Sequence, residues 1–453
     1  MADPYTCLIS RVIFPLQERL KGHDTLHVRR EMDDSQWWPR EKLEALQLSR
    51  LQALLQEAYR NVPYYREKLN DAGLAEGKVD TLSDLRKMPF LTKTQIRANS
   101  ERLKSTQAHG LARFNTGGSN GEPLIFWIGK ERVSHDVAAK WRATRWWGVD
   151  IGDPEVVVWG SPIELGAQDR LRVVRDMVFR THLLPAFEMS GRKLDEFVDT
   201  LRTVRPRMVF GYPSSISLIA EHAAKNGRRL DNLGTKVVFV TSERLYDHQR
   251  EMIESTFACP VANGYGGRDA GFIAHQCPAG GMHITAEDII VELVDGAGKV
   301  VPPGHEGEVV ITHLATGEFP FIRYQTGDVA VFEEKPCSCG RGLPLLKEIQ
   351  GRATDFVVAS DGTIMHGLAL IYVVRDIPGV ENFKIIQESL QETHVVLVTN
   401  SSFATESARL IEQGFKQRLG QNVKISIDQV AHIPREASGK YRYVVSQVAA
   451  VNF

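Results

Sequence analysis

The stretch Lys236-Val-Val-Phe-Val240 is an almost uninterrupted apolar run, and it gives the first indication of the fold. Two similar runs precede it, Val156-Val-Val-Trp159 and Met208-Val-Phe210, with helical patterns between them. A strand with one face in water would alternate polar and apolar residues, so these runs indicate strands that are buried on both faces. They therefore predict the sheet of an α/β fold.

The segments around these strands extend the prediction in both directions. Leu43–Leu69 carries apolar residues at spacings of three and four, which predicts a helix that Asn61-Val-Pro63 stops. Downstream, turns at Asp295-Gly296 and Pro302-Pro-Gly304 indicate a more antiparallel region. Its clearest expected strands are Ile289–Leu293 and Glu308–Ile311.

The pattern of expected strands and helices changes again after Gly351-Arg352. A helix at Ala404–Leu419 is bracketed by expected strands near Phe383–Gln387, His394–Thr399 and Val423–Ile427. A compact α+β unit of about 100 residues is a typical size for a domain. We therefore expect a large, multi-sheet N-terminal body over residues 1–350 and a small, mobile C-terminal domain over residues 351–453.

Composition narrows the class of protein. The 453 residues carry 55 basic and 56 acidic side chains, so a net charge of −1 offers no electrostatic footprint for nucleic acid. No apolar run approaches the roughly 20 residues that a membrane helix needs. Five cysteines, an odd count without a secretion signal, predict a reducing cytoplasm.

The first twenty residues, MADPYTCLISRVIFPLQERL, make a poor signal peptide. Arg11 interrupts their apolar patch, and Asp3 stands where an early positive cluster belongs. We expect an amphipathic segment that packs on the body, with a membrane anchor as the alternative.

A glycine-rich stretch, FNTGGSNGEPLIFW at Phe114–Trp127, is the first candidate site. Its core, Thr116–Gly121, can turn backbone N–H groups toward one anion, with the hydroxyls of Thr116 and Ser119 as further donors. It lacks the terminal Gly-Lys-Ser/Thr of a P-loop, so it would hold phosphate differently. The alternative is a plain hairpin turn.

A second stretch, Asn263–Gly271, combines three groups that suit a nucleotide. Tyr265 offers an aromatic face at the exit of a strand, Arg268 offers a cation for phosphate, and Asp269 offers a carboxylate for magnesium. The alternative is a strand-to-helix loop with a packed tyrosine.

Two further loops are less specific by themselves. In Arg323–Asp328, Asp328 follows a turn before an expected strand at Val329–Phe332. A carboxylate there can accept both hydroxyls of a ribose, or it can cap the turn. Ile433–Lys440 is a polar loop whose final lysine, taken alone, is an ordinary solvated charge.

In this order and at these separations, the four stretches resemble the adenylate-forming superfamily, the acyl-coenzyme A synthetases and their relatives. Within it the chain is similar to the phenylacetate–coenzyme A ligase branch, which includes CapK-type proteins. The resemblance spans roughly residues 40 to 445. It also includes Leu54–Arg66, Thr81–Arg86, Pro89–Lys93, Gly211–Ser214 and Gly351-Arg352.

The resemblance implies a role for each stretch. Tyr265, followed by Gly266, would stack on the adenine of ATP, with Ser242 and Glu243 on its other side. Asp328 would take the ribose hydroxyls. The β- and γ-phosphates would lie in the loop formed by Thr116, Gly117, Gly118, Ser119, Asn120 and Gly121.

The catalytic groups follow from the same resemblance. Lys440 would bridge the substrate carboxylate and the α-phosphate, while Arg268 and Asp269 would serve phosphate and magnesium. Arg352, with Gly351, would open the hinge about which the small domain rotates and withdraws Lys440.

The sequence departs from the family pattern at several of these positions. Asn120 replaces a hydroxyl of the phosphate loop, and Glu122 stands where the family has lysine. Arg268-Asp269 replaces the usual Thr-Glu or Ser-Glu, so the carboxylate is one methylene shorter. Arg268 can compensate as a bidentate donor to phosphate. The acidic pair expected after Arg352 is also missing from Ala353-Thr-Asp355.

The cysteines form a separate candidate site. Cys277, His283, Cys337 and Cys339 supply three thiols and an imidazole in two short segments, which is enough for a closed tetrahedral zinc site. Members of the similar branch show a matching set of residues. Free buried cysteines are the alternative, and His275 competes with His283 as the imidazole ligand.

The expected activity is ATP- and magnesium-dependent conversion of a carboxylic acid, aromatic or arylacetic, to an acyl-adenylate. Transfer to coenzyme A would follow, with release of AMP and pyrophosphate. The alternatives are transfer to an amine, as in a CapK-type amide ligase, and a degenerate nucleotide-binding protein without turnover. Trp141–Trp147 and Tyr212-Pro213 are candidates for the acid pocket, although tryptophans are more often core residues. A homodimer is a family-based expectation.

Overall fold

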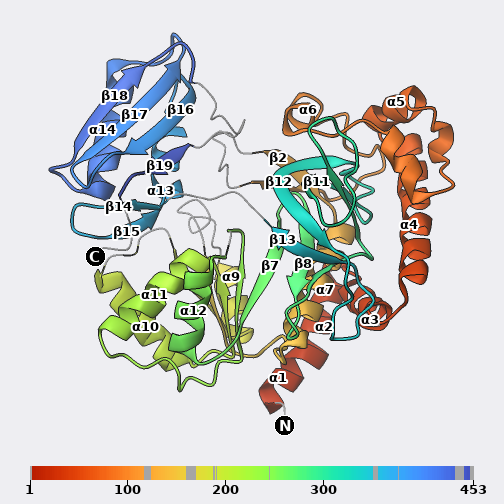
Figure 1. Cartoon of the computed structure of the whole chain (residues 1–453), viewed down its shortest axis with the longest axis horizontal. Helices are drawn as coiled ribbons and strands as arrows, with labels where there is room; N and C mark the ends of the chain where they lie inside the picture. The colour runs from red at the N-terminus through yellow and green to blue at the C-terminus, as the bar shows by residue number, and fades with distance from the viewer. Residues whose placement is uncertain are drawn as a thin grey trace.

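The computed structural model describes residues 3–116, 124–159, 170–186, 189, 191–243, 245–349, 356–375, 377–433 and 443–448. Figure 1 shows a large body, drawn from red to cyan, and a smaller C-terminal domain in blue. Within the described part of the chain, no helix is both long and apolar enough to cross a membrane.

Helices make up the start of the chain and wrap one side of the body (Figure 1). They are α1 (Pro4–Leu8), a π-helical turn (Ile9–Ile13), α2 (Phe14–Lys21), α3 (Thr25–Ser35), α4 (Arg40–Asn61), α5 (Pro63–Asp71) and α6 (Lys93–Ala98). The predicted stop is confirmed, because α4 ends at Asn61 and Pro63 begins α5. α7 (Lys130–Trp146) follows the hairpin of β1 (Ala112–Asn115) and β2 (Ile125–Ile128).

The body is organised around one sheet of eleven described strands, in the order β10-β11-β12-β13-β9-β8-β7-β6-β5-β3-β4. Its parallel part comprises β3 (Glu155–Trp159), β4 (Thr181–Pro185), β5 (Met208–Gly211), β6 (Val237–Thr241) and β7 (Val261–Gly267). Its antiparallel part comprises β8 (Gly271–Gln276), β9 (Met282–Ile284), β10 (Ile289–Val294), β11 (Glu306–His313), β12 (Tyr324–Glu333) and β13 (Leu345–Ile349).

Both faces of β5 and β6 are covered, as their apolar runs predicted, whereas β3 alternates buried and partly buried residues. Every residue of β5 and β6 is buried. One face packs with the residues of α10 (Gly191–Val204), α11 (Pro213–Lys225) and α12 (Asp247–Phe257). The other face packs against Ala143, Trp146 and Trp147 at the end of α7. The described part of the connection to β4 includes a further helix, α9 (Arg170–Val178).

One local prediction in the antiparallel region was wrong. Asp328 does not follow a turn, because β12 runs without a break from Tyr324 to Glu333. Gly327 has φ of +82°, and the pairing of β12 with β11 shifts register between Glu308 and Val310. The glycine therefore marks a bulge inside a strand, and a bulge can re-aim a neighbouring side chain.

The C-terminal domain has its own sheet and its own apolar core. Its elements are β14 (Phe356–Val358), β15 (Ile364–His366), α13 (Leu368–Arg375), β16 (Val380–Gln387), β17 (Glu392–Thr399), α14 (Thr405–Leu419), β18 (Lys424–Gln429) and β19 (Val444–Ser446). The sheet order is β18-β17-β16-β19, and the core joins residues from Val357 to Val444. The boundary expected at residue 350 falls on residues 350–355, outside the described part of the chain.

Candidate active site and cysteine–histidine cluster

Three neighbouring parallel strands bring two of the predicted motifs to one edge of the sheet. β5 pairs with β6 through Gly211 and Val240, and β6 pairs with β7 through Thr241 and Gly264. The residues that follow these strands therefore converge at the carboxyl edge, where open α/β sheets bind ligands.

Ser242, the first residue beyond β6, carries backbone strain. Its φ is +73°, a left-handed conformation that costs a non-glycine residue on the order of 1–3 kcal/mol. The side chain of Ser242 is exposed. The next residue, Glu243, is held by a hydrogen bond from the Ser214 hydroxyl at the start of α11. The strained loop is thus tied to the Gly211–Ser214 motif.

Tyr265 and Asp328, 63 residues apart in the chain, are brought together by the sheet. The Tyr265 hydroxyl donates to Oδ2 of Asp328 at 3.0 Å. Burial, together with the Asp328 charge, raises the pKa of Tyr265, so its hydroxyl stays protonated and can donate. Tyr265 lies inside β7 rather than at its exit, and the segment after it leads to β8, so the alternative of a strand-to-helix loop was wrong. Gly266 lets this hairpin close, since a Cβ there would lie 2.2 Å from the Gly271 carbonyl oxygen.

Asp269 is held by two buried side chains that the sequence analysis did not identify. The Tyr324 hydroxyl donates to Oδ2 of Asp269 at 2.5 Å. Arg132 of α7 donates to the main-chain carbonyls of Asp269 and Arg268, each at 3.0 Å. The Arg132 guanidinium is itself paired with Asp136 at 3.2 Å. These contacts fix the turn that carries both predicted catalytic residues of β7–β8.

The phosphate-loop prediction can be followed only at its start. Thr116 and Leu124 close the β1–β2 hairpin, because the Thr116 amide donates to the Leu124 carbonyl and the Leu124 amide donates to the Thr116 hydroxyl, both at 3.0 Å. Other predicted site residues lie outside the described residues: Gly117, Gly118, Ser119, Asn120, Gly121, Arg352 and Lys440.

Aromatic side chains line the ends of β3 and β5. Trp159 stacks on Tyr212 with ring centroids 4.4 Å apart, and it also stacks on Phe210 at 5.9 Å. Both Trp159 and Tyr212 are half-buried, so they retain some accessible ring surface. By contrast, Trp141 donates to Asp150 and packs edge-on against Phe14, which supports its interpretation as a core residue.

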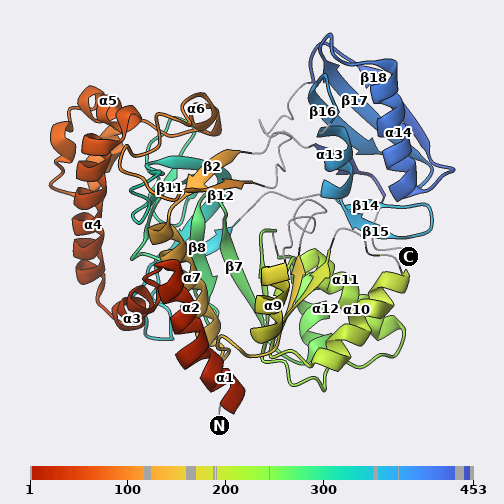
Figure 2. The same cartoon turned by 180° about the vertical axis from the view of Figure 1, so that it is seen from behind.

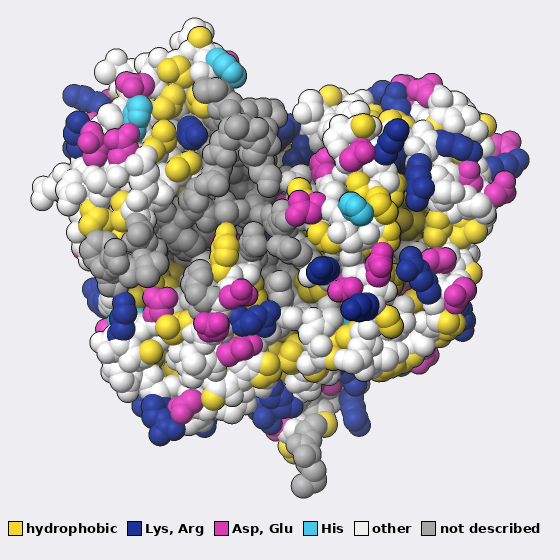
Figure 3. Space-filling view, in the orientation of Figure 1, with side chains coloured by type: hydrophobic (Ala, Val, Ile, Leu, Met, Phe, Trp, Pro, Cys, Tyr) yellow, Lys and Arg dark blue, Asp and Glu magenta, His cyan; other side chains and the backbone are white. Residues whose placement is uncertain are grey.

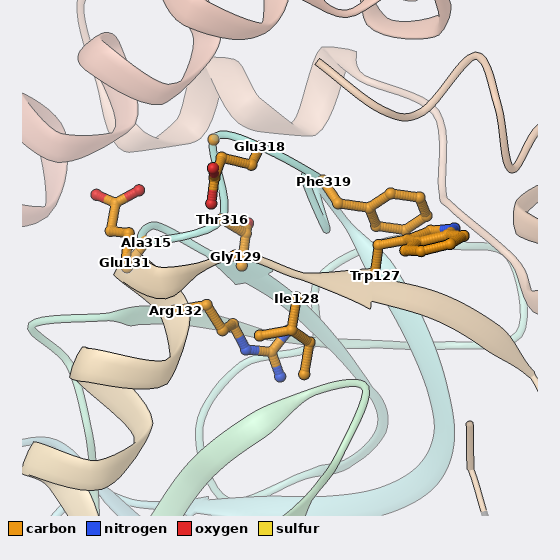
Figure 4. Close-up of a pocket in the computed structure, with 10 residues that line it drawn as sticks. Trp127, Ile128, Gly129, Glu131, Arg132, Ala315, Thr316, Glu318 and Phe319 are labelled. Carbon is orange, nitrogen blue, oxygen red and sulfur yellow. The ribbon is translucent and has the colours of Figure 1, made fainter. Parts of the chain in front are cut away.

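A small pocket lies beside Arg132, which is one of its lining residues (Figure 4). It is lined by residues of β2, the start of α7 and the loop between β11 and β12, and it includes the carboxylates of Glu131 and Glu318. Gly129 permits the close approach of Glu318, because a Cβ there would collide with its Oε2. None of the predicted site residues lines this pocket.

The four predicted metal ligands converge on one point. The sulfur and nitrogen atoms of Cys277, His283, Cys337 and Cys339 all lie within 4.8 Å of one another. Cys277 Sγ is 3.6 Å from Cys337 Sγ, and Cys339 Sγ is 3.2 Å from His283 Nε2. Tetrahedral zinc with bonds of about 2.0–2.3 Å requires ligand atoms separated by roughly 3.5–3.8 Å, close to these distances.

His283, rather than its competitor His275, belongs to this cluster. Nδ1 of His283 lies 3.4 Å from the Leu343 carbonyl oxygen, a contact that can fix the ring so that Nε2 faces the thiols. His275 is 1% exposed and stacks on Phe272. Burial lowers the pKa of His275 to about 3, so it is neutral.

Arg132 and Tyr324 were missed because their contacts span 137 and 55 residues of sequence. The one local signal for Arg132 is Asp136, four residues on and on the same helix face. Tyr324 stood inside the quoted motif at Arg323–Asp328, but nothing local distinguishes its hydroxyl from that of any strand tyrosine.

Comparison with known proteins places this geometry in context. Residues 357–447 match the family model of the CapK C-terminal domain. The chain is 24% identical to Protein CapK of Staphylococcus aureus, over 89% of each chain. It is 25% identical to the phenylacetate-coenzyme A ligase of Thermus thermophilus, over 90% of this chain and 97% of that one. A crystal structure of 2-hydroxyisobutyryl-CoA ligase with 2-HIB-AMP and CoA superposes with a TM-score of 0.65 at 21% identity, covering 91% of each chain.

The large body with its C-terminal domain is therefore the fold of the adenylate-forming superfamily. In sequence, the chain is a homologue of CapK and of the phenylacetate–coenzyme A ligases. The resemblance carried by the sequence motifs is confirmed at this level.

Proposed function

We propose that this protein is an AMP-forming acid–thiol ligase. It would convert a carboxylic acid and ATP to an acyl-adenylate and pyrophosphate, then transfer the acyl group to coenzyme A with release of AMP. The observation that most supports this function is the contact between Tyr265 and Asp328 beside the held carboxylate of Asp269. The relatives named as coenzyme A ligases support the same chemistry.

The Tyr265–Asp328 pair would form the nucleoside site. The Tyr265 hydroxyl donates to Oδ2 of Asp328 and orients this carboxylate, an acceptor-only group that suits ribose hydroxyls. The ring of Tyr265 would stack on adenine, and the strained Ser242-Glu243 loop at the end of β6 would face the base from the other side.

Asp269 and Arg268 would serve the phosphates. Tyr324 holds Oδ2 of Asp269, so Oδ1 is the oxygen available to a magnesium ion. Magnesium bound there would neutralise phosphate charge that otherwise repels the attacking carboxylate. Arg132 would act as a positioning residue, since it holds the main chain of Arg268 and Asp269 without reaching substrate.

The remaining roles rest on the resemblance. Residues 116–121 would hold the β- and γ-phosphates, and Lys440 would bridge the carboxylate and the α-phosphate. Residues 1–350 and 351–453 would act as body and lid, with a hinge at Arg352 that withdraws Lys440 once the adenylate has formed. A cytoplasmic location and a homodimer likewise stay predictions.

The acid is proposed to be aromatic or arylacetic. Trp159 and Tyr212 stand at the carboxyl edge, next to the Ser214–Glu243 contact, and offer stacked ring surface to a flat apolar group. Trp141 is excluded from this role by its packing in the core.

The cysteine–histidine cluster is proposed to bind one structural zinc ion. Three thiols and one imidazole fill a tetrahedral site and leave no position open for a reacting group. Zinc would tie the segment after β8 to the loop between β12 and β13. In the sheet, β9 separates β8 from β13.

An amine acceptor is the second candidate, because the CapK domain model covers the C-terminal domain that would select the acceptor. Mass spectrometry of the products decides between the two. The purified protein would be incubated with MgATP and a panel of arylacetic, benzoic and fatty acids, with either coenzyme A or an amine. An acyl-CoA thioester supports the ligase, whereas an amide formed without coenzyme A favours the CapK-type activity. ATP binding without any acyl product or pyrophosphate would indicate the degenerate protein.

A further inference from the structure

The first helical segment of the chain presents a row of apolar side chains to solvent. Leu8, Val12, Leu16 and Leu20, here called the N-terminal stripe, are 48%, 52%, 54% and 80% exposed. Of the twelve large hydrophobic side chains that are exposed among the described residues, seven lie on this segment or on α9, whose C-terminal end lies against α1. The α9 members are Val173, Val174 and Met177.

The helix geometry keeps the stripe on one side. In an α-helix a four-residue spacing drifts around the axis by about 40° at each step. The π-helical turn Ile9–Ile13 has more residues per turn and rotates less per residue, which offsets that drift. The four side chains therefore stay closer to one line than a regular helix would allow.

The opposite face of the same segment is anchored on the body. Phe14 packs edge-on against Trp141 at 5.1 Å between ring centroids. The Thr6 hydroxyl donates to the Gly152 carbonyl at 3.3 Å, and Ile9 is 1% exposed. The expectation that this segment packs on the body is thus met by one face, and the stripe is held outward.

The exposed charges of this segment are basic. Arg11, Arg19 and Lys21 are exposed. Its two acids are occupied, because Asp3 pairs with Arg180 and the buried Glu18 accepts a hydrogen bond from Thr25 at 2.5 Å. Lys21 also lies 3.6 Å from Glu18.

We propose that the N-terminal stripe and its basic flanks dock the protein on an anionic lipid surface. An amphipathic helix with large apolar residues on one face and Arg or Lys beside them lies in the interface between headgroups and acyl chains. Anionic headgroups complement the cations, and the cytoplasmic leaflet supplies such a surface. Figure 2 shows α1 and α2 along the edge of the body that lies away from the C-terminal domain, so docking there would leave that domain unobstructed.

A second copy of the chain fits this surface less well. A two-fold contact uses the same patch on both subunits, so it would place Arg11, Arg19 and Lys21 of one chain against the same cations of the other. Anionic lipid satisfies both the apolar and the charged features at once.

Vesicle co-sedimentation of the full chain tests the proposal. We expect binding to phosphatidylcholine vesicles that contain phosphatidylglycerol, weak binding to pure phosphatidylcholine, and release by salt. Replacing Leu16 and Leu20 by serine should lower the partition coefficient by about a hundred-fold or more. The changes Arg11→Gln and Arg19→Gln should each lower it roughly five-fold on anionic vesicles only.

Matched controls use exposed residues far from this segment. Leu410→Ser with Val430→Ser removes two exposed apolar side chains of the C-terminal domain, and Arg192→Gln with Arg409→Gln removes two exposed cations. Neither pair should change binding. Absence of binding, or equal binding to both vesicle types, would overturn the proposal. So would self-association in analytical ultracentrifugation that the Leu16→Ser, Leu20→Ser variant abolishes while vesicle binding persists.

Discussion

The Tyr324 hydroxyl donates to Oδ2 of Asp269 and so orients the carboxylate of the proposed magnesium ligand. Removing a side chain that orients a metal ligand typically costs about 10–100-fold in metal affinity or activity. Tyr324→Phe should therefore raise the magnesium concentration for half-maximal pyrophosphate release by about ten-fold or more. Steady-state kinetics against magnesium at saturating ATP measures this.

Tyr65→Phe is the matched control for that change. The Tyr65 hydroxyl is equally buried, but it donates to the Pro320 carbonyl and accepts from the Ile322 amide. Its loss should lower the free energy of unfolding by about 1–3 kcal/mol without altering magnesium dependence. If both variants keep the wild-type magnesium dependence, Asp269 does not bind the ion as proposed.

Asp288 pairs with Arg50 of α4 and His135 of α7, and these contacts should make the stability of the fold depend on pH. Burial opposes its charge, but His135 at 2.7 Å and Arg50 at 3.0 Å outweigh burial and lower the pKa of Asp288 to about 2. A lowered carboxyl pKa stabilises the fold above the unfolded value of about 3.9, and that stability is lost as pH falls through about 2. The shift corresponds to roughly 2–3 kcal/mol.

Asp288→Asn should remove this pH-dependent part of the stability. Denaturant unfolding between about pH 4 and about pH 2 should then show a shallower loss of stability than in the wild type. The exposed ion pair of Asp231 with Arg229 provides the control, since Asp231→Asn should leave the profile nearly unchanged. An unchanged profile in Asp288→Asn would contradict the assignment.

Site residues whose side-chain type suggests a ligand could be predicted from the sequence. Residues whose role depends on contacts with distant parts of the chain could not. Cys277, His283, Cys337 and Cys339 were identified from ligand type and from the family resemblance, and the structure brings them together. Tyr265 and Asp328 were identified through the resemblance. Arg132 was not, because its function depends on carbonyl groups 136 and 137 residues away.

Among the secondary-structure elements, the cysteine-bearing loops depend most on a ligand. Without zinc, three thiols and an imidazole would be packed in two contacts of 3.2 and 3.6 Å with weak mutual interactions. We expect one zinc ion per chain by elemental analysis.

Cys339→Ser should lower zinc affinity by at least about a hundred-fold and lower the thermal midpoint. Cys7→Ser changes a half-buried cysteine outside the cluster and should alter neither. A full zinc complement in Cys339→Ser would exclude this site.

Some strands could be predicted from local sequence, whereas others depend on pairing with distant parts of the chain. β5 and β6 were predictable because burial on both faces leaves a continuous apolar run. The strand at Asp328 was expected only from Val329 onward, because Gly327 looks like a turn residue in sequence. Pairing with β11 on one side and β13 on the other overrides that local preference and converts the turn into a bulge.

The whole molecule consists of two units whose relative movement is central to the proposed cycle. If Lys440 acts only in adenylation, Lys440→Ala should slow pyrophosphate release by at least about a hundred-fold. Transfer from a supplied acyl-adenylate to coenzyme A should stay within a few-fold of wild type. Lys424→Ala removes an exposed lysine of the same domain and should affect neither half-reaction. Equal loss of both half-reactions in Lys440→Ala would refute a role confined to adenylation.

Acidic and basic side chains are interspersed over the face shown in Figure 3, in line with the net charge of −1. No extended basic area for nucleic acid is visible among the described residues of that face. The division into a body and a C-terminal domain was predictable from the sequence. The α+β pattern of strands and a helix that begins after Arg352 corresponds to a separate apolar core.

The central claim is that the chain activates a carboxylate as an adenylate. Acid-dependent exchange of labelled pyrophosphate into ATP tests it most directly, because exchange needs neither coenzyme A nor an amine. We predict exchange with an aromatic or arylacetic acid, none without acid, and a large loss in Asp328→Ala. Calorimetric ATP binding without exchange for any acid of the panel would contradict the claim.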